Sequence, residues 1–423
     1  MNSTLPQLPS KKWFVFAAVA LAYFFVNFAT FASLGVVLFT MAGELNWSMT
    51  AAGFTFSLLG LACGLSSTLP TMAMKYIGAR GSMGIGAALF FFGCLLASVS
   101  HSLFVFDIAI AMLGAGYTFA GNIPGVILIA QWFDRGSARL VGIYLMLGAL
   151  GAAAAPPTVA FVVSGIGWRG HWQVLAVAAA FVGLICLAFV RDNEHGKAAT
   201  PDETGTRAPQ PKSAWTPQQA VWTPQFLVLT AGLVFTMTAV TTINGVVVTH
   251  LVKLGSSPIT AAWALGLLSF TGTLMKGGAG HLCETKSPKT FVVVGLLCQA
   301  VGCALLIIAT SSVVEFAAAI VFGAGWAFAL VGGWVLLMRY FGGTTGARLL
   351  AIVQLVTTVG AAGPIGAGLI ADHWGTFTPI FVLYAIVLAA LAVPTLLMRA
   401  PAAAHGGAKV LDYDASSPVA EPA

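Results

Sequence analysis

Long apolar stretches alternate with short polar turns along almost the whole chain. A helix that crosses a lipid bilayer needs about 20 mostly apolar residues, and the chain contains stretches of this length in regular succession. We expect twelve of them, at residues 13–39, 51–74, 82–99, 104–131, 140–164, 172–190, 225–251, 260–280, 291–310, 314–338, 349–371 and 378–397. The pattern therefore predicts an all-α integral membrane protein with twelve transmembrane helices.

Two polar segments interrupt this series. Residues 191–223 contain acidic residues and four prolines, a composition typical of a flexible cytoplasmic linker. Residues 400–423 are polar and rich in alanine, and we expect a disordered cytoplasmic tail there. These segments divide the chain into an N-terminal six-helix bundle at 1–190 and a C-terminal six-helix bundle at 224–399.

The composition excludes a soluble enzyme. Only 8% of the 423 residues are charged and 58% are hydrophobic, whereas a soluble domain carries roughly 25% charged residues. The 48 glycines suit helices that pack closely in lipid. The six cysteines show no CxxC spacing, which indicates neither a zinc site nor a disulfide framework. We expect no metal and no cofactor.

The distribution of Lys and Arg predicts the orientation. With the N-terminus inside, sixteen of the 19 basic residues fall in cytoplasmic segments, Arg169 and Lys253 fall outside, and Lys276 lies within a helix. An excess of Lys and Arg marks the cytoplasmic side. We therefore expect a multi-pass inner-membrane protein with both termini in the cytoplasm and no cleaved signal peptide. The net charge of +6 then reflects topology and does not indicate a nucleic-acid partner.

The two halves of the chain share short motifs. Gly114-Ala-Gly-Tyr-Thr-Phe resembles Gly323-Ala-Gly-Trp-Ala-Phe, and Asp107 and Glu315 open the same two helices. Each pair is separated by about half the chain. A tandem duplication of this kind is typical of transporters in which two bundles rock around a site near the middle of the bilayer.

The loops of both halves resemble those of the major facilitator superfamily. Its signature GxLaDrxGrR has degenerate counterparts at residues 71–80 and 280–289, where Lys75 replaces the aspartate in the first. The resemblance implies a fold of two six-helix bundles. It also implies that these loops take part in conformational change, through Lys75, Gly78, Arg80, Gly280 and Glu284.

Other motifs resemble the monocarboxylate porters and the oxalate/formate antiporters. Glu44-Leu-Asn-Trp47-Ser48 follows the first helix, Trp132-Phe133-Asp134-Arg135 follows the fourth, and Gly167-Trp168-Arg169 follows the fifth. The resemblance implies a carboxylate substrate. The chain lacks two charged residues of that branch. The acid that the branch has in the eighth helix corresponds to Gly272 here, and the antiporter's lysine in the eleventh helix corresponds to Val353 or Gln354.

Lys276 is the main candidate for substrate binding. It lies inside an apolar helix, where an unpaired lysine costs on the order of 3 kcal/mol. In the branch that the chain resembles, an arginine at this place binds the substrate carboxylate. Alternatively, Lys276 could extend to the cytoplasmic edge of the membrane. Because lysine is a compact point charge, an anchor of this type favours one carboxylate over two.

Further polar side chains could complete the substrate site. Trp326 matches a position where the family has an aromatic residue, and the others could equally tie helices together, because buried polar groups need partners. The set is Tyr23, Asn27, Asn122, Tyr144, Asn244, Trp326 and Gln354. Asp107 and Glu315 are candidates for proton coupling, or else helix N-terminal acids that the helix dipole favours.

These observations predict a secondary active transporter and not an enzyme. It would move a small organic monocarboxylate across the inner membrane by alternating access, by proton symport or by anion exchange. The alternative is an exporter of a drug-like or apolar compound, for which Lys276 would be dispensable. A receptor or membrane enzyme finds no support, since the sequence has no HExxH and no phosphate loop. We expect a monomer whose partners are the organic anion, protons in the case of symport, and the lipid bilayer.

Overall fold

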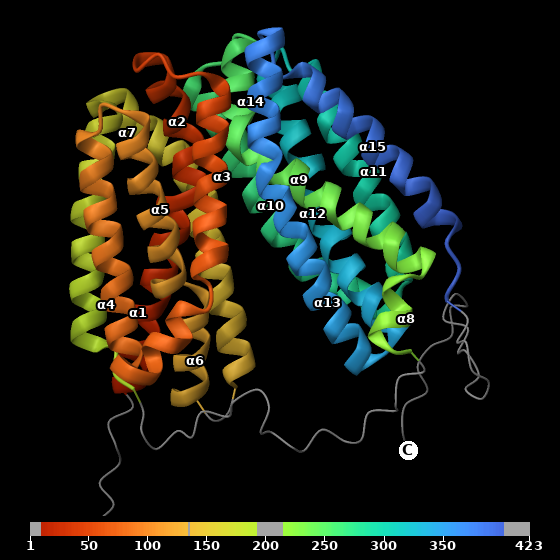
Figure 1. Cartoon of the computed structure of the whole chain (residues 1–423), viewed down its shortest axis with the longest axis horizontal. Helices are drawn as coiled ribbons and strands as arrows, with labels where there is room; N and C mark the ends of the chain where they lie inside the picture. Colours follow the sequence, from red (N-terminus) through yellow and green to blue (C-terminus); the bar gives the residue numbers. More distant parts are fainter. Residues whose placement is uncertain (1–9, 134–135, 193–214, 402–423) are drawn as a thin grey trace, which may run out of the picture. The chain divides into compact units, whose positions relative to one another are not determined.

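The computed structural model describes residues 10–133, 136–192 and 215–401 (Figure 1). Every regular element within these ranges is a helix, which confirms the predicted all-α class. The chain forms two compact units, Met1–Gly205 (unit 1) and Thr206–Ala423 (unit 2). Most of the predicted tail at 400–423 and of the predicted linker at 191–223 lies outside the described residues.

Unit 1 begins with a long helix that is interrupted by one turn of π-helix. Its described elements are α1 (Ser10–Asn27), η1 (Phe28–Ala32), α2 (Ser33–Glu44), α3 (Met49–Ser66), α4 (Leu69–Val99), α5 (Leu103–Ala120), α6 (Asn122–Trp132) and α7 (Ser137–Phe189). In Figure 1 these helices run side by side along one common direction.

Unit 2 repeats this plan with an interruption near its end. Its described elements are α8 (Pro217–Val221), α9 (Pro224–Lys253), α10 (Pro258–Thr285), α11 (Pro288–Ile307), α12 (Ser312–Phe341), α13 (Gly343–Thr357), the 3-10 turn η2 (Thr358–Ala362), α14 (Gly363–Trp374) and α15 (Thr378–Leu397). The short helix α8 lies inside the segment predicted as a linker, where Thr216 and Gln219 form a reciprocal capping box.

Eleven helical stretches among the described residues are long and apolar enough to cross a membrane. The sequence predicts twelve. The counts differ because the fifth and sixth predicted helices are joined in α7. As one straight rod, the 51 residues Arg139–Phe189 would measure about 77 Å, whereas the hydrocarbon core is about 30 Å thick. A sharp break at Gly167, with φ 71° and ψ 172°, divides them.

The two arms of α7 fold back on each other. Tyr144, before the break, stacks on Tyr23 of α1. Cys186, after the break, has its Sγ atom 3.9 Å from the carbonyl oxygen of Ala18, which also lies in α1. Both arms therefore lie against α1. The joined helix α7 thus supplies two antiparallel spans, in agreement with the twelve predicted.

Several helix ends differ from those expected. The second predicted helix, 51–74, stops at Ser66, and the first loop signature at 71–80 is absorbed into α4, which bends at Gly78 (φ 70°, ψ 174°). The fourth predicted helix is interrupted at Gly121. Glycine tolerates these backbone angles without steric cost, and apolar periodicity alone does not show where such a bend falls.

Two pairs of consecutive helices pack with almost no space between their backbones. A Cβ atom at Gly86 of α4 would collide with the backbone of Ala120 in α5, and one at Gly295 of α11 would collide with the backbone of Ala329 in α12. Small residues allow this close approach. In lipid the helices are then held together by van der Waals packing, because the hydrophobic effect does not drive their association there.

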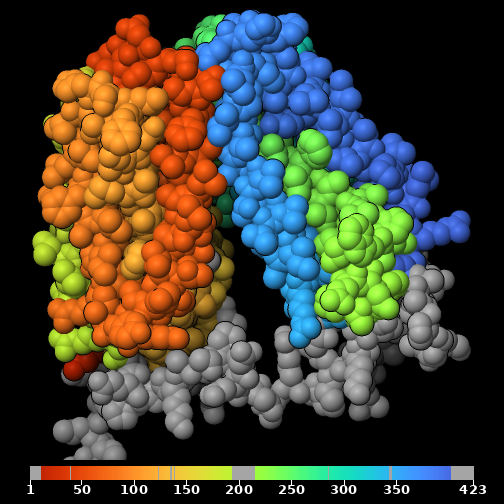
Figure 2. Space-filling view, viewed as in Figure 1, coloured from red at the N-terminus to blue at the C-terminus, as the bar shows by residue number. Residues whose placement is uncertain are grey.

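Large apolar side chains cover much of the surface of both units. Leu65 in unit 1 and Val313 in unit 2 are 84% and 74% exposed. Figure 2 shows one face of the surface, coloured along the chain. A soluble protein rarely exposes large continuous apolar patches. Together with the spans, this surface indicates a multi-pass membrane protein.

The break in α7 should depend on glycine at position 167. We expect Gly167→Ala to destabilise the protein by about 1–3 kcal/mol, because a side chain disfavours its backbone angles. Gly165→Ala is the matched control, since a Cβ atom meets nothing within 4 Å at either position and only Gly167 has a positive φ. The measurement is thermal unfolding in detergent. Equal unfolding temperatures for the two variants would contradict the assigned break.

Candidate functional site

A half-buried lysine of unit 2 lies against an aromatic ring of another helix. The Nζ atom of Lys276 in α10 lies 3.4 Å from the ring centroid of Trp326 in α12. A cation over an indole face is stabilised by about 0.5–2 kcal/mol. Among the side chains that the structure describes, an ion pair joins Arg169 to Glu44, and no carboxylate lies within 4.0 Å of Lys276. An aromatic face takes the place of a counter-ion.

The contact between Lys276 and Trp326 depends on the absence of a side chain at Gly272. A Cβ atom at Gly272 would lie 2.7 Å from Cε3 and 3.0 Å from Cζ3 of the indole ring. The ring therefore fills the space where the branch that the sequence resembles has an acid. The indole Nε1–H is buried and has no hydrogen-bond partner within the described part of the chain.

A second polar cluster lies in unit 1. Tyr23 of α1 stacks on Tyr144 of α7 with ring centroids 4.4 Å apart and planes 17° apart. Tyr144 donates from its hydroxyl to the carbonyl of Gly121 at 2.9 Å. Asn27 donates to the carbonyl of Tyr23 at 2.8 Å and accepts from the hydroxyl of Tyr117 at 3.3 Å. The structure thus brings three predicted site residues together.

Tyr117 belongs to this cluster and was not predicted. It is the fourth residue of the motif Gly114-Ala-Gly-Tyr, and Trp326 is the fourth residue of the matching motif in the second half. The repeat was therefore the signal that could have identified it, since equivalent positions of a duplicated fold lie at equivalent places in each half.

The remaining predicted polar residues contribute less. Asn244 donates from Nδ2 to the carbonyl of Val240, one turn earlier in the same helix. Gln354 is exposed on α13. Asn122 begins α6 directly after the break at Gly121, and its side chain lies outside what the structure describes. None of these positions identifies a ligand.

The two acids at matching helix starts each accept a hydrogen bond from a hydroxyl group. Thr55 donates to Asp107 Oδ1 at 2.6 Å, and Ser256 donates to Glu315 Oε2 at 3.0 Å. Their burial differs, because Glu315 is only 2% exposed, whereas Asp107 is half-buried.

Two of the three motifs that resemble carboxylate porters, at residues 44–48 and 167–169, meet at one end of unit 1. Glu44 at the end of α2 accepts from Trp168 Nε1 at 2.6 Å and from Arg169 Nη1 at 2.8 Å. The guanidinium group of Arg169 also lies 4.0 Å from the ring of Trp168. This network fixes the segment after the Gly167 break to α2.

Comparison with known proteins decides the family. The sequence profile described as Major Facilitator Superfamily matches residues 19–251 and 229–413, which together span most of the chain. The chain belongs to the Major Facilitator Superfamily. This result confirms the superfamily and its transporter class, which is not an enzyme class, whereas the carboxylate branch stays a prediction.

Two curated relatives of this superfamily member share part of its sequence. A "probable L-galactonate transporter" of Escherichia coli (strain K12) is 28% identical over 173 residues, 40% of this chain and 38% of the relative. "Drug efflux pump JefA" of Mycobacterium tuberculosis (strain ATCC 25618 / H37Rv) is 28% identical over 158 residues, 36% of this chain and 31% of the relative. The matches therefore span less than half the length of these relatives.

Solved structures of other transporters share the fold. A mutant of the nucleoside transporter NupG has a TM-score of 0.74 at 14% identity, covering 92% of this chain and 99% of NupG. A D-xylose–proton symporter has a TM-score of 0.69 at 15% identity, covering 91% and 97%. At this identity the likeness shows the superfamily fold alone.

In the superfamily loop of unit 1, an acid from another part of the chain accepts backbone hydrogen bonds. Lys75 and Arg80 are exposed, and no acid lies in the aspartate position of the signature. Instead Asp192 accepts hydrogen bonds from the backbone N–H of Ala79 at 2.9 and 3.1 Å, directly after the bend at Gly78. This carboxylate caps the helical segment that begins there, as acidic caps commonly do.

The second superfamily loop, residues 280–289, spans the end of α10 and the start of α11. A Cβ atom at Gly280 would meet nothing within 4 Å, so packing does not require a glycine there. The side chain of Glu284 lies outside the described residues. Next to it, Arg339 of α12 donates to the carbonyl of Cys283.

The packing of Gly272 against Trp326 can be tested by a pair of substitutions. We expect Gly272→Ala to lower the thermal unfolding temperature, because the added methyl group overlaps the indole ring. Trp326→Leu should largely remove this penalty in the double variant, as contacting residues are energetically coupled. Gly278→Ala is the control on the same helix, where a Cβ atom meets nothing within 4 Å. Additive effects would contradict the contact.

Proposed function

We propose that this transporter carries a small organic anion and that Lys276 binds its carboxylate. The observation that carries the proposal is the ammonium group of Lys276, which lies over the indole of Trp326 at 3.4 Å. An ammonium group has three hydrogen-bond donors. The aromatic face stabilises the positive charge, but it is not a conventional hydrogen-bond acceptor for these donors. A carboxylate would supply these acceptors and neutralise the charge.

The relatives support an organic anion and also an alternative. L-Galactonate, the substrate named for the Escherichia coli relative, is a carboxylate. The efflux pump of Mycobacterium tuberculosis favours the alternative, which is export of a drug-like or apolar compound. Under that alternative, Trp326 would serve as an apolar wall and Lys276 would have no role in binding the substrate.

The proposed cycle is alternating access across the inner membrane, with both termini in the cytoplasm. Transport would occur by proton symport, with Asp107 or Glu315 as the proton site, or by exchange of one anion for another. The further polar ligands that we propose are Tyr23, Asn27, Asn122, Tyr144, Asn244, Trp326 and Gln354. The conformational loops would contain Lys75, Gly78, Arg80, Gly280 and Glu284.

Uptake of carboxylates by a Lys276→Gln variant tests the anchor. In proteoliposomes supplied with radiolabelled acids, including L-galactonate and aromatic carboxylates, we expect the variant to lose at least about tenfold in uptake. A hydrogen bond to a charged group is worth about 1.5–3 kcal/mol, and glutamine cannot replace the charge. Lys253→Gln is the matched control, because Lys253 is exposed and its Nζ donates to the carbonyl of Gly375.

Each outcome of this experiment has a clear meaning. Saturable uptake by the wild type and the control that the Lys276→Gln variant lacks supports the anion carrier. Equal uptake by the wild type and the variant rejects Lys276 as the anchor. If the wild type takes up no carboxylate and instead exports apolar dyes, the efflux alternative is correct.

A further inference from the structure

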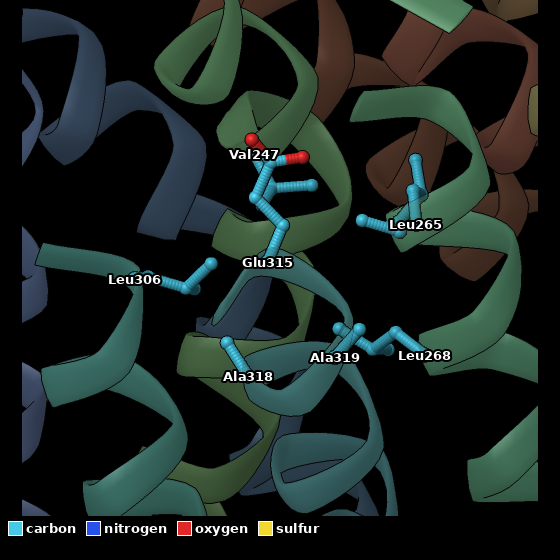
Figure 3. A pocket seen from close by; sticks show the side chains of 8 residues that line it. Val247, Leu265, Leu268, Leu306, Glu315, Ala318 and Ala319 are labelled. Atoms are coloured by element: carbon cyan, nitrogen blue, oxygen red, sulfur yellow. The ribbon is translucent and has the colours of Figure 1, made fainter. Parts of the chain in front are cut away.

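Two internal cavities, one in each unit, are too small for an organic ligand. The cavity in unit 2 has about 10 Å³ and is bordered by Glu315 and by apolar side chains such as Val247 and Leu265 (Figure 3). The cavity in unit 1 also has about 10 Å³ and is lined by apolar side chains, Phe25 and Met83 among them. Each is close to the minimum that one water molecule needs. The surface of unit 1 offers more, where α1 begins.

Aromatic side chains gather where α1 begins and where α6 and α7 end. Phe14 of α1 stacks on Phe189 of α7, with ring centroids 5.5 Å apart. Trp13 of α1 packs edge-on against Phe133, directly after α6, at 5.3 Å. Three of these rings remain open to the surroundings, since Trp13, Phe14 and Phe189 are 50%, 53% and 44% exposed. We call these three residues the aromatic platform.

Three exposed basic residues flank the aromatic platform. Lys11 and Lys12 directly precede it on α1, and Arg191 follows the end of α7. The Nζ atom of Lys12 lies 5.5 Å from the ring centroid of Phe133. The carbonyl of Arg191 accepts a hydrogen bond from Trp132 Nε1 at 2.8 Å. Because Trp132 and Phe133 are consecutive, these contacts hold Lys12 and Arg191 at the same end of unit 1.

The charge of these basic residues is not neutralised by a neighbouring acid in the part of the chain that the structure describes. Asp192, next to Arg191, accepts hydrogen bonds from the backbone N–H of Ala79 with both carboxylate oxygens. No described carboxylate lies within 4.0 Å of the Lys11, Lys12 or Arg191 side chains. Their positive charge is therefore available to an anion from outside the chain.

The position of the charge indicates what kind of anion fits. Topology alone accounts for basic residues at the predicted cytoplasmic end of a helix, but not for their place beside exposed aromatic rings. Aromatic rings at a membrane surface lie at the level of the lipid headgroups, where Lys and Arg attract anionic lipids. A soluble anion would pair with the basic residues and leave the platform uncovered. A phospholipid covers both.

We propose that this end of unit 1 binds an anionic phospholipid. Its phosphodiester group pairs with Lys11, Lys12 and Arg191, and the first carbons of its acyl chains lie on Phe14 and Phe189. The attraction weakens at high salt, because exposed charges are screened. Since the proposed substrate anchor lies in unit 2, the lipid site is independent of the substrate that the transporter carries.

Native mass spectrometry of the full-length protein measures the affinity for the first bound lipid. We expect dioleoyl phosphatidylglycerol to bind at least about tenfold more tightly than dioleoyl phosphatidylcholine, whose choline group is repelled by the basic residues. The triple variant Lys11→Gln, Lys12→Gln, Arg191→Gln should lose this preference. An unchanged preference in the variant, or none in the wild type, would overturn the proposal.

A second triple variant separates a local site from total charge. Lys286→Gln, Arg348→Gln and Arg399→Gln together remove three exposed basic residues of unit 2 on the same predicted side of the membrane. This variant should keep the preference for phosphatidylglycerol. Equal losses in the two triple variants would show that net charge alone governs binding. Displacement of the lipid by millimolar glycerol phosphate would instead identify a site for a soluble phosphate, and either result overturns the proposal.

Phe14→Ala tests the apolar contact separately from charge. We expect the affinity for phosphatidylglycerol to fall about fivefold, because part of the surface that the acyl chains cover is removed. Phe161→Ala is the control, since Phe161 is 71% exposed elsewhere on unit 1, and it should leave the affinity unchanged. Equal affinities of the two variants would contradict the role of the platform.

Photolabelling locates the lipid on the wild-type protein and needs no variant. In proteoliposomes, phosphatidylglycerol with a diazirine near the carboxyl end of one acyl chain should label the start of α1 and the end of α7. Excess unlabelled phosphatidylglycerol should suppress this labelling, and excess phosphatidylcholine should not. Labelling spread evenly over all lipid-facing helices, or suppressed equally by both lipids, would overturn the proposal.

Discussion

In a lipid bilayer no water is available to pair with backbone N–H and C=O groups, so each span must satisfy its own. An interruption of a helix within the bilayer therefore requires a substitute hydrogen-bond partner. At the break before α6, the hydroxyl of Tyr144 donates to the carbonyl of Gly121. At η2, the hydroxyl of Thr241 donates to the carbonyl of Gly360 at 2.6 Å. Tyr144, which we propose as a substrate ligand, thus already pairs with irregular backbone, so its substitution would also remove the donor at this break.

The same scarcity of water determines where charge can lie. Arg169 and Glu44 are partly exposed and paired, whereas Lys276 has an indole ring and Glu315 has a serine hydroxyl as their described partners. Glu315 is buried and Lys276 is half-buried, and neither has an opposite charge within 4.0 Å among the side chains that the structure describes. Under the proposed function, the absence of an internal counter-ion leaves the ammonium group of Lys276 free to pair with a substrate anion.

Much of this arrangement could be predicted from the sequence, and the reasons are physical. Apolar runs of about 20 residues locate the spans because the bilayer imposes that length, and a lysine within such a run identifies Lys276 directly. The bends at Gly78, Gly121 and Gly167 could not be located, because many of the 48 glycines occupy ordinary helical positions. The contact between Lys276 and Trp326 could not be predicted either. It depends on the space at Gly272, where α10 meets α12, a helix that is not its neighbour in the sequence. Asp192 likewise caps Ala79 only because the fold brings the end of α7 to the bend in α4.

The close packing of α4 on α5 and of α11 on α12 also affects how the chain is assembled. Each pair consists of neighbours in sequence joined by a short turn, so its contacts form with little loop-closure entropy. The glycines in the contact, such as Gly86 and Gly295, leave no room for lipid between the helices. Each hairpin can therefore associate soon after both of its helices have been synthesised and inserted, before the helices that follow it in the chain are available. These hairpins would then serve as the templates on which the later helices of each half dock.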